Sequence, residues 1–124
     1  MSYKLLVICF LLVSCASNRM VETNLYFGQS KPDGGKVSEK EWDGFKKEYV
    51  AKVFKEGSTV IQADGNWLDP VSHQLITEPT YVVIYFYNKS KETSRQIDSL
   101  RYWYKTKFQQ QSVLRVDKKV RAAF

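Results

Sequence analysis

Residues 58–88 read STVIQADGNWLDPVSHQLITEPTYVVIYFYN, and this stretch decides how the rest of the chain can be arranged. It contains two runs rich in β-branched and aromatic residues, 58–69 and 74–88, which are typical of strands joined by the turn PVSH. Each run holds one residue that disfavours a regular strand, Gly65 in the first and Pro79 in the second. Because these residues lie at similar distances from the turn, the sequence favours one long hairpin with a shared kink. The alternative is two short hairpins, the first turning at the Asp-Gly dipeptide.

A helix is expected on each side of this hairpin. In the first, Ser38 and Glu41 have the spacing of a capping box, Gly57 is a natural stop, and one face carries Trp42, Phe45, Tyr49 and Val53. The second is expected to begin near Thr93, with Gln96 in the same capping relation, and to bury Ile97, Leu100, Tyr104 and Phe108. Both helices therefore present an apolar face to a common core.

Two shorter β-type runs lie outside the helices. Residues 23–28, TNLYFG, are stopped by the turn sequence KPDGG, and residues 112–116, SVLRV, precede a basic tail with Lys118, Lys119 and Arg121. The predicted order is β-α-β-β-α-β, which is the order of the ferredoxin-like fold. The sequence thus predicts one α+β domain, residues 23–124, with a four-stranded antiparallel sheet and two helices on one of its faces.

The third strand predicts which side chains face the helices, because neighbouring residues of a strand point to opposite faces. One set is wholly aliphatic or phenyl and is assigned to the core: Val82, Ile84 and Phe86. The other set is assigned to the uncovered face: Tyr81, Val83, Tyr85 and Tyr87. Tyr26 from the first strand joins this Tyr-rich face, and either Leu114 or Arg115 joins it from the last strand, depending on the register.

An open sheet face with several Tyr side chains is unusual for a surface that meets only solvent, and contiguous aromatic surface often marks an interface or a ligand site. Three interpretations remain open. The favoured one is sheet-to-sheet self-association as a homodimer. The second is a pocket for a small amphipathic or sugar-like ligand, or an enzyme site, with Trp67, Glu78 and Arg115 at its rim. In the third, the long hairpin and the tail cover the Tyr rings.

No constellation of catalytic or metal-binding residues stands out in the sequence. His73 is the single histidine and lies in the expected hairpin turn, so neither a zinc site nor a histidine base is predicted. Asp64 and Asp69 flank Trp67, but Asp-Gly and Asp-Pro are common turn formers, and Ser112 has no nearby base. RNA-recognition domains share this fold, but the third strand lacks their Gly-containing basic-aromatic signature. We therefore expect no cofactor, metal or nucleic acid, and favour a protein that is not an enzyme.

The first residues indicate export and lipidation. Lys4 precedes a short apolar run, residues 5–12, which is well below the roughly 20 residues needed to span a bilayer. The run leads into LVSC, ending at Cys15, which resembles the bacterial lipobox. The resemblance implies a signal peptide of residues 1–14, cleavage before Cys15, a diacylglycerol thioether on its sulfur, and an amino terminus acylated by a fatty acid such as palmitate. Residues 15–22 are then expected to form a lipidated tether.

This lipid anchor would determine where the domain works. Alanine rather than aspartate follows Cys15, which by resemblance to Gram-negative lipoproteins favours the outer membrane, facing the periplasm. Cys9 leaves with the signal peptide and Cys15 carries lipid, so no disulfide is expected. The net charge of +6 favours approach to anionic surfaces such as lipid headgroups.

Several blocks of sequence together resemble a known family. The blocks are NLYFG at 24–28, VSEKEW at 37–42, DGNW at 64–67, EP at 78–79 and QSVLRV at 111–116. They are similar to domain of unknown function 3574, a family of small bacterial proteins whose members are often predicted lipoproteins. The resemblance implies one folded unit over residues 23–117. It implies no established activity, so it assigns no catalytic residue.

Lipidation at Cys15 has a direct test. Mass spectrometry of the native protein should show an amino terminus at Cys15 that carries acyl chains, and globomycin, which blocks the lipoprotein signal peptidase, should leave the uncleaved form. An unmodified and uncleaved amino terminus, or processing that globomycin does not affect, contradicts the assignment.

Overall fold

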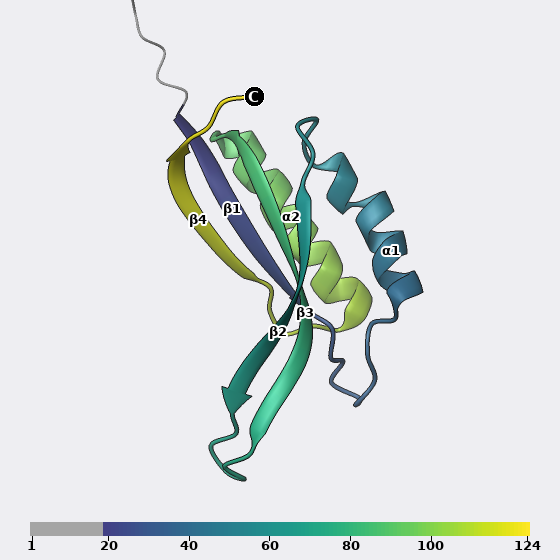
Figure 1. The fold of residues 1–124 in the computed structure, drawn as a ribbon. Coiled ribbons are helices and arrows are strands. Elements are labelled where there is room, and N and C mark those ends of the chain that lie inside the picture. The colour runs from purple at the N-terminus through teal and green to yellow at the C-terminus, as the bar shows by residue number, and fades with distance from the viewer. Residues whose placement is uncertain (1–18) are drawn as a thin grey trace, which may run out of the picture.

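The computed structural model describes residues 19–124 and contains a four-stranded antiparallel sheet with two α-helices against one face (Figure 1). The strand order is β2-β3-β1-β4, and every neighbouring pair is antiparallel. This arrangement confirms the predicted ferredoxin-like α+β fold. Along the chain the elements are β1 (Arg19–Gly28), α1 (Glu39–Glu48), the 3-10 helix η1 (Val50–Lys52), β2 (Thr59–Leu68), β3 (Leu75–Asn88), α2 (Lys91–Phe108) and β4 (Leu114–Arg121).

β2 and β3 form the one long hairpin that the sequence favours. Gly65 lies opposite Glu78, and Asp64 lies opposite Pro79. Pro79 has no N–H to donate. It immediately precedes Thr80, which is at the end of the part of β3 that pairs with β1. The Pro79 carbonyl still accepts a hydrogen bond from the Gln29 N–H at 2.9 Å. Beyond Pro79, β2 and β3 pair only with each other and extend beyond the rest of the sheet (Figure 1).

The helix starts follow local capping chemistry. The capping box of Ser38 and Glu41 is present as predicted. The prediction that Thr93 caps the second helix is wrong, because the N-cap of α2 is Ser90. The Ser90 hydroxyl accepts a hydrogen bond from the Thr93 N–H, and the Thr93 hydroxyl accepts one from the Ser90 N–H, the role predicted for the Gln96 side chain. The buried stripe of α2 is the predicted one: Ile97, Leu100, Tyr104 and Phe108.

The outer strands are longer than the sequence predicts. β1 begins at Arg19, so residues 19–22 belong to the sheet rather than to a tether. β4 runs on to Arg121, so the expected basic tail is part of a strand: Lys118, Lys119 and Arg121. The two strands pair along nearly their full lengths, which satisfies the backbone groups that β4 directs toward β1. The expected signal peptide and Cys15 lie outside the described residues, and no helix within residues 19–124 is long and apolar enough to cross a membrane.

The side of β3 predicted to be open is covered by the helices, and the predicted core side is open. The covered residues are Tyr81, Val83, Tyr85 and Tyr87. The uncovered and partly exposed residues are Val82, Ile84 and Phe86. The predicted orientation of β3 is wrong, because the buried Tyr hydroxyls form hydrogen bonds within the core. Tyr85 Oη donates to the Val50 carbonyl at 2.8 Å, and Tyr87 Oη lies 2.7 Å from Thr23 Oγ1. Burial raises the pKa of the Tyr85 hydroxyl, which stays protonated.

Aromatic rings fill the space between the sheet and the helices. Trp42 of α1 stacks on Tyr81 of β3 with ring centroids 4.3 Å apart, and Phe27 of β1 meets Tyr104 of α2 edge to face at 4.7 Å. Tyr104 Oη also donates a hydrogen bond to the Gly28 carbonyl at 2.7 Å. This packing holds β1 and β3, the two central strands, against both helices.

Leu25 is fully buried on β1, so Leu25→Ala should lower the free energy of unfolding by about 2–5 kcal/mol through lost apolar burial and the cavity left behind. Leu75 is 68% exposed, and Leu75→Ala should change the free energy of unfolding by less than about 0.5 kcal/mol. Urea unfolding followed by circular dichroism measures both changes. Equal effects would contradict the assignment of Leu25 to the core side of β1.

Candidate functional site

The sheet face that the helices leave uncovered carries apolar side chains from every strand. Its most exposed members include Leu114, Ile61 and Val116, with 58%, 47% and 42% of their surfaces accessible. The register makes the surface continuous, since Tyr26 on β1 has Val82 on one side and Leu114 on the other. We call this surface the open face, and its central members are Tyr26, Ile61, Val82, Ile84, Phe86, Leu114 and Val116.

The charges in the middle of the open face balance one another. Glu22 of β1 pairs with Lys118 of β4 at 3.4 Å, and Glu22 also accepts a hydrogen bond from Asn24 Nδ2 at 3.1 Å. The open face therefore combines an apolar surface with a neutral ion pair.

A cleft of about 410 Å³ lies at the end of the open face where β1 leaves the sheet. Three of the predicted site residues line this cleft: Tyr26 from β1, Trp67 from β2 and Glu78 from β3. The segment after α2 forms another wall, residues 109–112. Gly28 leaves room for the Glu78 carboxylate, because a Cβ atom at position 28 would lie 2.6 Å from Glu78 Oε1.

Only one of the two carboxylate oxygens of Glu78 has a hydrogen-bond partner within residues 19–124. Its Oε1 accepts a hydrogen bond from the Ser30 N–H at 2.8 Å, and its Oε2 forms neither a hydrogen bond nor an ion pair within residues 19–124. Lys31 also lines the cleft, but its ammonium group pairs with Glu41 at 3.1 Å. One carboxylate oxygen is thus available to a hydrogen-bond donor in the cleft.

The other predicted site residues lie on the helix side of the sheet: Tyr81, Tyr85, Tyr87 and Arg115. Tyr81 stacks on Trp42 and accepts a hydrogen bond from Gln62 at 3.1 Å, and the remaining tyrosines belong to the core. Their assignment to the open face is wrong, because the pairing of β1 with β3 places them on the same side as the buried Leu25.

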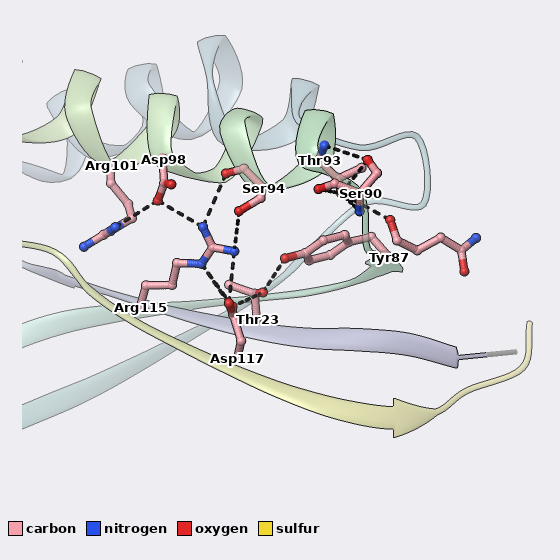
Figure 2. Close-up of polar contacts among 10 residues, drawn as sticks. Thr23, Tyr87, Ser90, Thr93, Ser94, Asp98, Arg101, Arg115 and Asp117 are labelled. Atoms are coloured by element: carbon pink, nitrogen blue, oxygen red, sulfur yellow. Dashed lines mark hydrogen bonds and ion pairs between the residues drawn. The ribbon is translucent and has the colours of Figure 1, made fainter.

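Arg115 of β4 makes polar contacts with residues of α2 (Figure 2) and is not among the residues that line the cleft. Its guanidinium donates to Asp98 Oδ1 at 3.0 Å and to the Ser94 hydroxyl at 3.2 Å, and it pairs with Asp117 at 3.0 Å. Asp117 extends the network by accepting a hydrogen bond from Thr23 Oγ1 at 2.6 Å. Only 12% of the Arg115 side chain is exposed, so its charge serves the packing of β4 against α2.

Both carboxylates of this network favour their charged forms. Burial raises the pKa of Asp117, but hydrogen bonds from Arg115 and Thr23 outweigh it, and the pKa lies below its ordinary value. Burial likewise opposes ionisation of Asp98, but hydrogen bonds from Arg101 and Arg115 outweigh it and lower that pKa too. Sequence reasoning missed this network, for which the local signal is the spacing of Asp98 and Arg101 by one helical turn.

The other polar candidates are scattered. His73 lies exposed in the hairpin turn with a φ of 55°. Asp69 stabilises the hairpin turn, since its carboxylate accepts hydrogen bonds from the N–H groups of residues 71 and 72. Asp64 and Trp67 lie on opposite faces of β2. Across the described part of the chain, no three His, Cys, Asp or Glu side chains come together in a group that could hold a metal ion.

Comparisons with known proteins relate the chain to a family and to a fold. The family described as Protein of unknown function (DUF3574) matches residues 22–124. A phage SAM lyase in complex with S-methyl-5'-thioadenosine has a similar fold, with a TM-score of 0.59 and 18% identity, covering 81% of this chain and 81% of that chain. A phage SAM lyase in its apo state gives a TM-score of 0.61 and 16% identity, covering 86% of this chain and 92% of that chain. No curated protein matches the sequence.

Asp117→Asn should weaken the network around Arg115 and lower the free energy of unfolding by about 1–2 kcal/mol at neutral pH. A carboxylate with a lowered pKa in the folded state contributes stability above its unfolded pKa of about 3.9 and loses that contribution as the pH falls through the folded pKa. The difference between parent and variant should therefore shrink as the pH falls below about 4. Urea unfolding at neutral and acidic pH measures this difference.

A matched control is Asp43→Asn, which removes an exposed pair with Lys46 on α1. It should change the free energy of unfolding by less than about 0.5 kcal/mol. If the effect of Asp117→Asn is the same at both pH values, charge in the network does not contribute to stability.

Proposed function

We propose that this chain, which belongs to the family described as Protein of unknown function (DUF3574), is a binding module that associates with a second copy of itself through the open face. The observation that carries the proposal is the exposure of apolar side chains on that face, with Leu114, Ile61 and Val116 each more than two-fifths exposed. Burying such contiguous apolar surface against a partner removes it from water and is favourable.

A second copy is the occupant that the charges favour. The whole chain carries a net charge of +6, so two copies repel each other overall. In the middle of the open face, however, the charges of Glu22 and Lys118 balance. Two open faces related by a two-fold axis can therefore meet without an excess of like charge.

The geometry of the sheet also suits this association. Two sheets that pack face to face lie about 10 Å apart and fill the space between them with interdigitating apolar side chains. The open face supplies such side chains from all four strands: Ile61, Ile84, Tyr26 and Leu114 are examples from β2, β3, β1 and β4. The expected homodimer thus remains the proposal, with a different set of side chains at its interface.

The lipid expected on Cys15 would assist the same association. β1 begins at Arg19, close in sequence to Cys15, so the anchor would hold the domain near the membrane surface. Exposed basic side chains at this end of the sheet suit an anionic surface: Lys89, Lys91, Lys119 and Arg121. Confinement to one surface raises the effective concentration of copies and promotes self-association.

A small-ligand protein or an enzyme is the second candidate, and the cleft around Glu78 favours it. The phage SAM lyases with a similar fold are enzymes, and one of them is described in complex with S-methyl-5'-thioadenosine. Their sequences are too different to transfer a substrate to this chain. The cleft itself must therefore indicate the chemistry.

Val116→Lys places a charge in the middle of the proposed interface at a position that is 42% exposed in one copy. Sedimentation of the unlipidated chain should show a dimer for the parent and a monomer for this variant, because a buried unpaired charge opposes association. Tyr102→Lys is the control, since Tyr102 is a 56% exposed residue on α2 and this variant should remain a dimer. A parent that stays monomeric as concentration rises, or a Val116→Lys variant that still dimerises, would contradict the proposal.

A further inference from the structure

We infer that the cleft between Trp67 and Glu78 binds a sugar ring, from a saccharide or a nucleoside, through two neighbouring hydroxyl groups. This inference goes beyond self-association and does not require it, because a single copy supplies the whole lining. The volume of about 410 Å³ falls within the range of roughly 300–1,000 Å³ typical of small-ligand sites.

The Glu78 carboxylate supplies the polar anchor. Its Oε1 is already oriented by the Ser30 N–H, and its Oε2 has no partner among the described residues. Two adjacent hydroxyl groups match the two oxygens of a carboxylate, and hydrogen bonds to a charged acceptor are stronger than those between neutral groups. The glycine at position 28 allows the carboxylate to take this position, because a Cβ atom there would lie 2.6 Å from Glu78 Oε1.

Two aromatic side chains supply the apolar part of the site. Trp67 of β2 lines the cleft, and 47% of its surface is exposed. Tyr26 of β1 also lines the cleft. A sugar ring presents C–H groups on one face, which can pack on an aromatic ring, while its hydroxyl groups point to the sides. Trp67 pairs with Ile76, and Gly65 pairs with Glu78. These two pairs are neighbours on the same face of the hairpin, so Trp67 and Glu78 are close to each other across it.

The rest of the lining suits a neutral polyol better than a charged or wholly apolar ligand. Gln109, Gln111 and Ser112 have side chains that can both donate and accept hydrogen bonds. An anion would be repelled by Glu78, and an apolar ligand would desolvate Glu78 Oε2 without giving it a hydrogen-bond partner. The net positive charge of the chain opposes the binding of a cation.

The test uses the intrinsic fluorescence of Trp67 and two probes, N,N'-diacetylchitobiose for the saccharide source and adenosine for the nucleoside source. At least one probe should change the fluorescence of the full unlipidated chain in a saturable manner. Trp67→Phe should abolish the signal, and Trp103→Phe should retain it, since Trp103 lies on α2 outside the cleft. For the nucleoside arm, 2'-deoxyadenosine should bind more weakly than adenosine because it lacks one hydroxyl of the pair.

Glu78→Gln is the decisive variant, because its amide oxygen can still accept from the Ser30 N–H while the negative charge is lost. We expect its dissociation constant for the binding probe to rise about tenfold or more, with an unchanged circular dichroism spectrum. Its sedimentation should match the parent, which separates this inference from the proposed dimer. Saturable binding by neither probe, or binding that Glu78→Gln leaves unchanged, would overturn the inference.

Discussion

The pairing of β1 with both of its neighbours determines which side chains of the sheet face the helices and which face outward. β1 lies between β3 and β4, and Leu25 has Val83 on one side and Arg115 on the other. All three belong to the side that the helices cover, so the alternate residues are left on the open face. A shift of one residue in the pairing of β1 with β3 would place Ile84 under the helices and Tyr85 outside. The open face, the cleft and the network around Arg115 all follow from this register.

Local features of the fold could be predicted because their signals are short-range. The Ser38 capping box, the buried stripe of α2 and the paired irregularities at Gly65 and Pro79 depend on spacing within one or two elements. The orientation of β3 could not be predicted in this way, because both of its faces are apolar. It depends on distant partners, the Thr23 hydroxyl and the Val50 carbonyl, which allow tyrosine hydroxyls to be buried.

The candidate site shows the same division. Tyr26, Trp67 and Glu78 come from three strands, and the structure brings them together at one cleft. Arg115 could not be placed from the sequence, because the register of the last strand decides whether it or Leu114 reaches the open face. The wall formed by residues 109–112 had no local signal, since it depends on where the segment after α2 passes the end of β1.

The open face and the cleft are neighbouring parts of one surface, and Tyr26 and Leu114 belong to both. Association through the open face would bring a second copy close to the mouth of the cleft, so partner binding and ligand binding would be able to influence each other. An isotope-filtered nuclear Overhauser experiment on a mixture of labelled and unlabelled chains tests association through the open face, because it detects only contacts between copies. We expect contacts between copies at the methyl groups of Val82 and Ile84. Contacts between copies that involve only α1 and α2, or the absence of any such contact in a sample that sediments as a dimer, would contradict association through the open face.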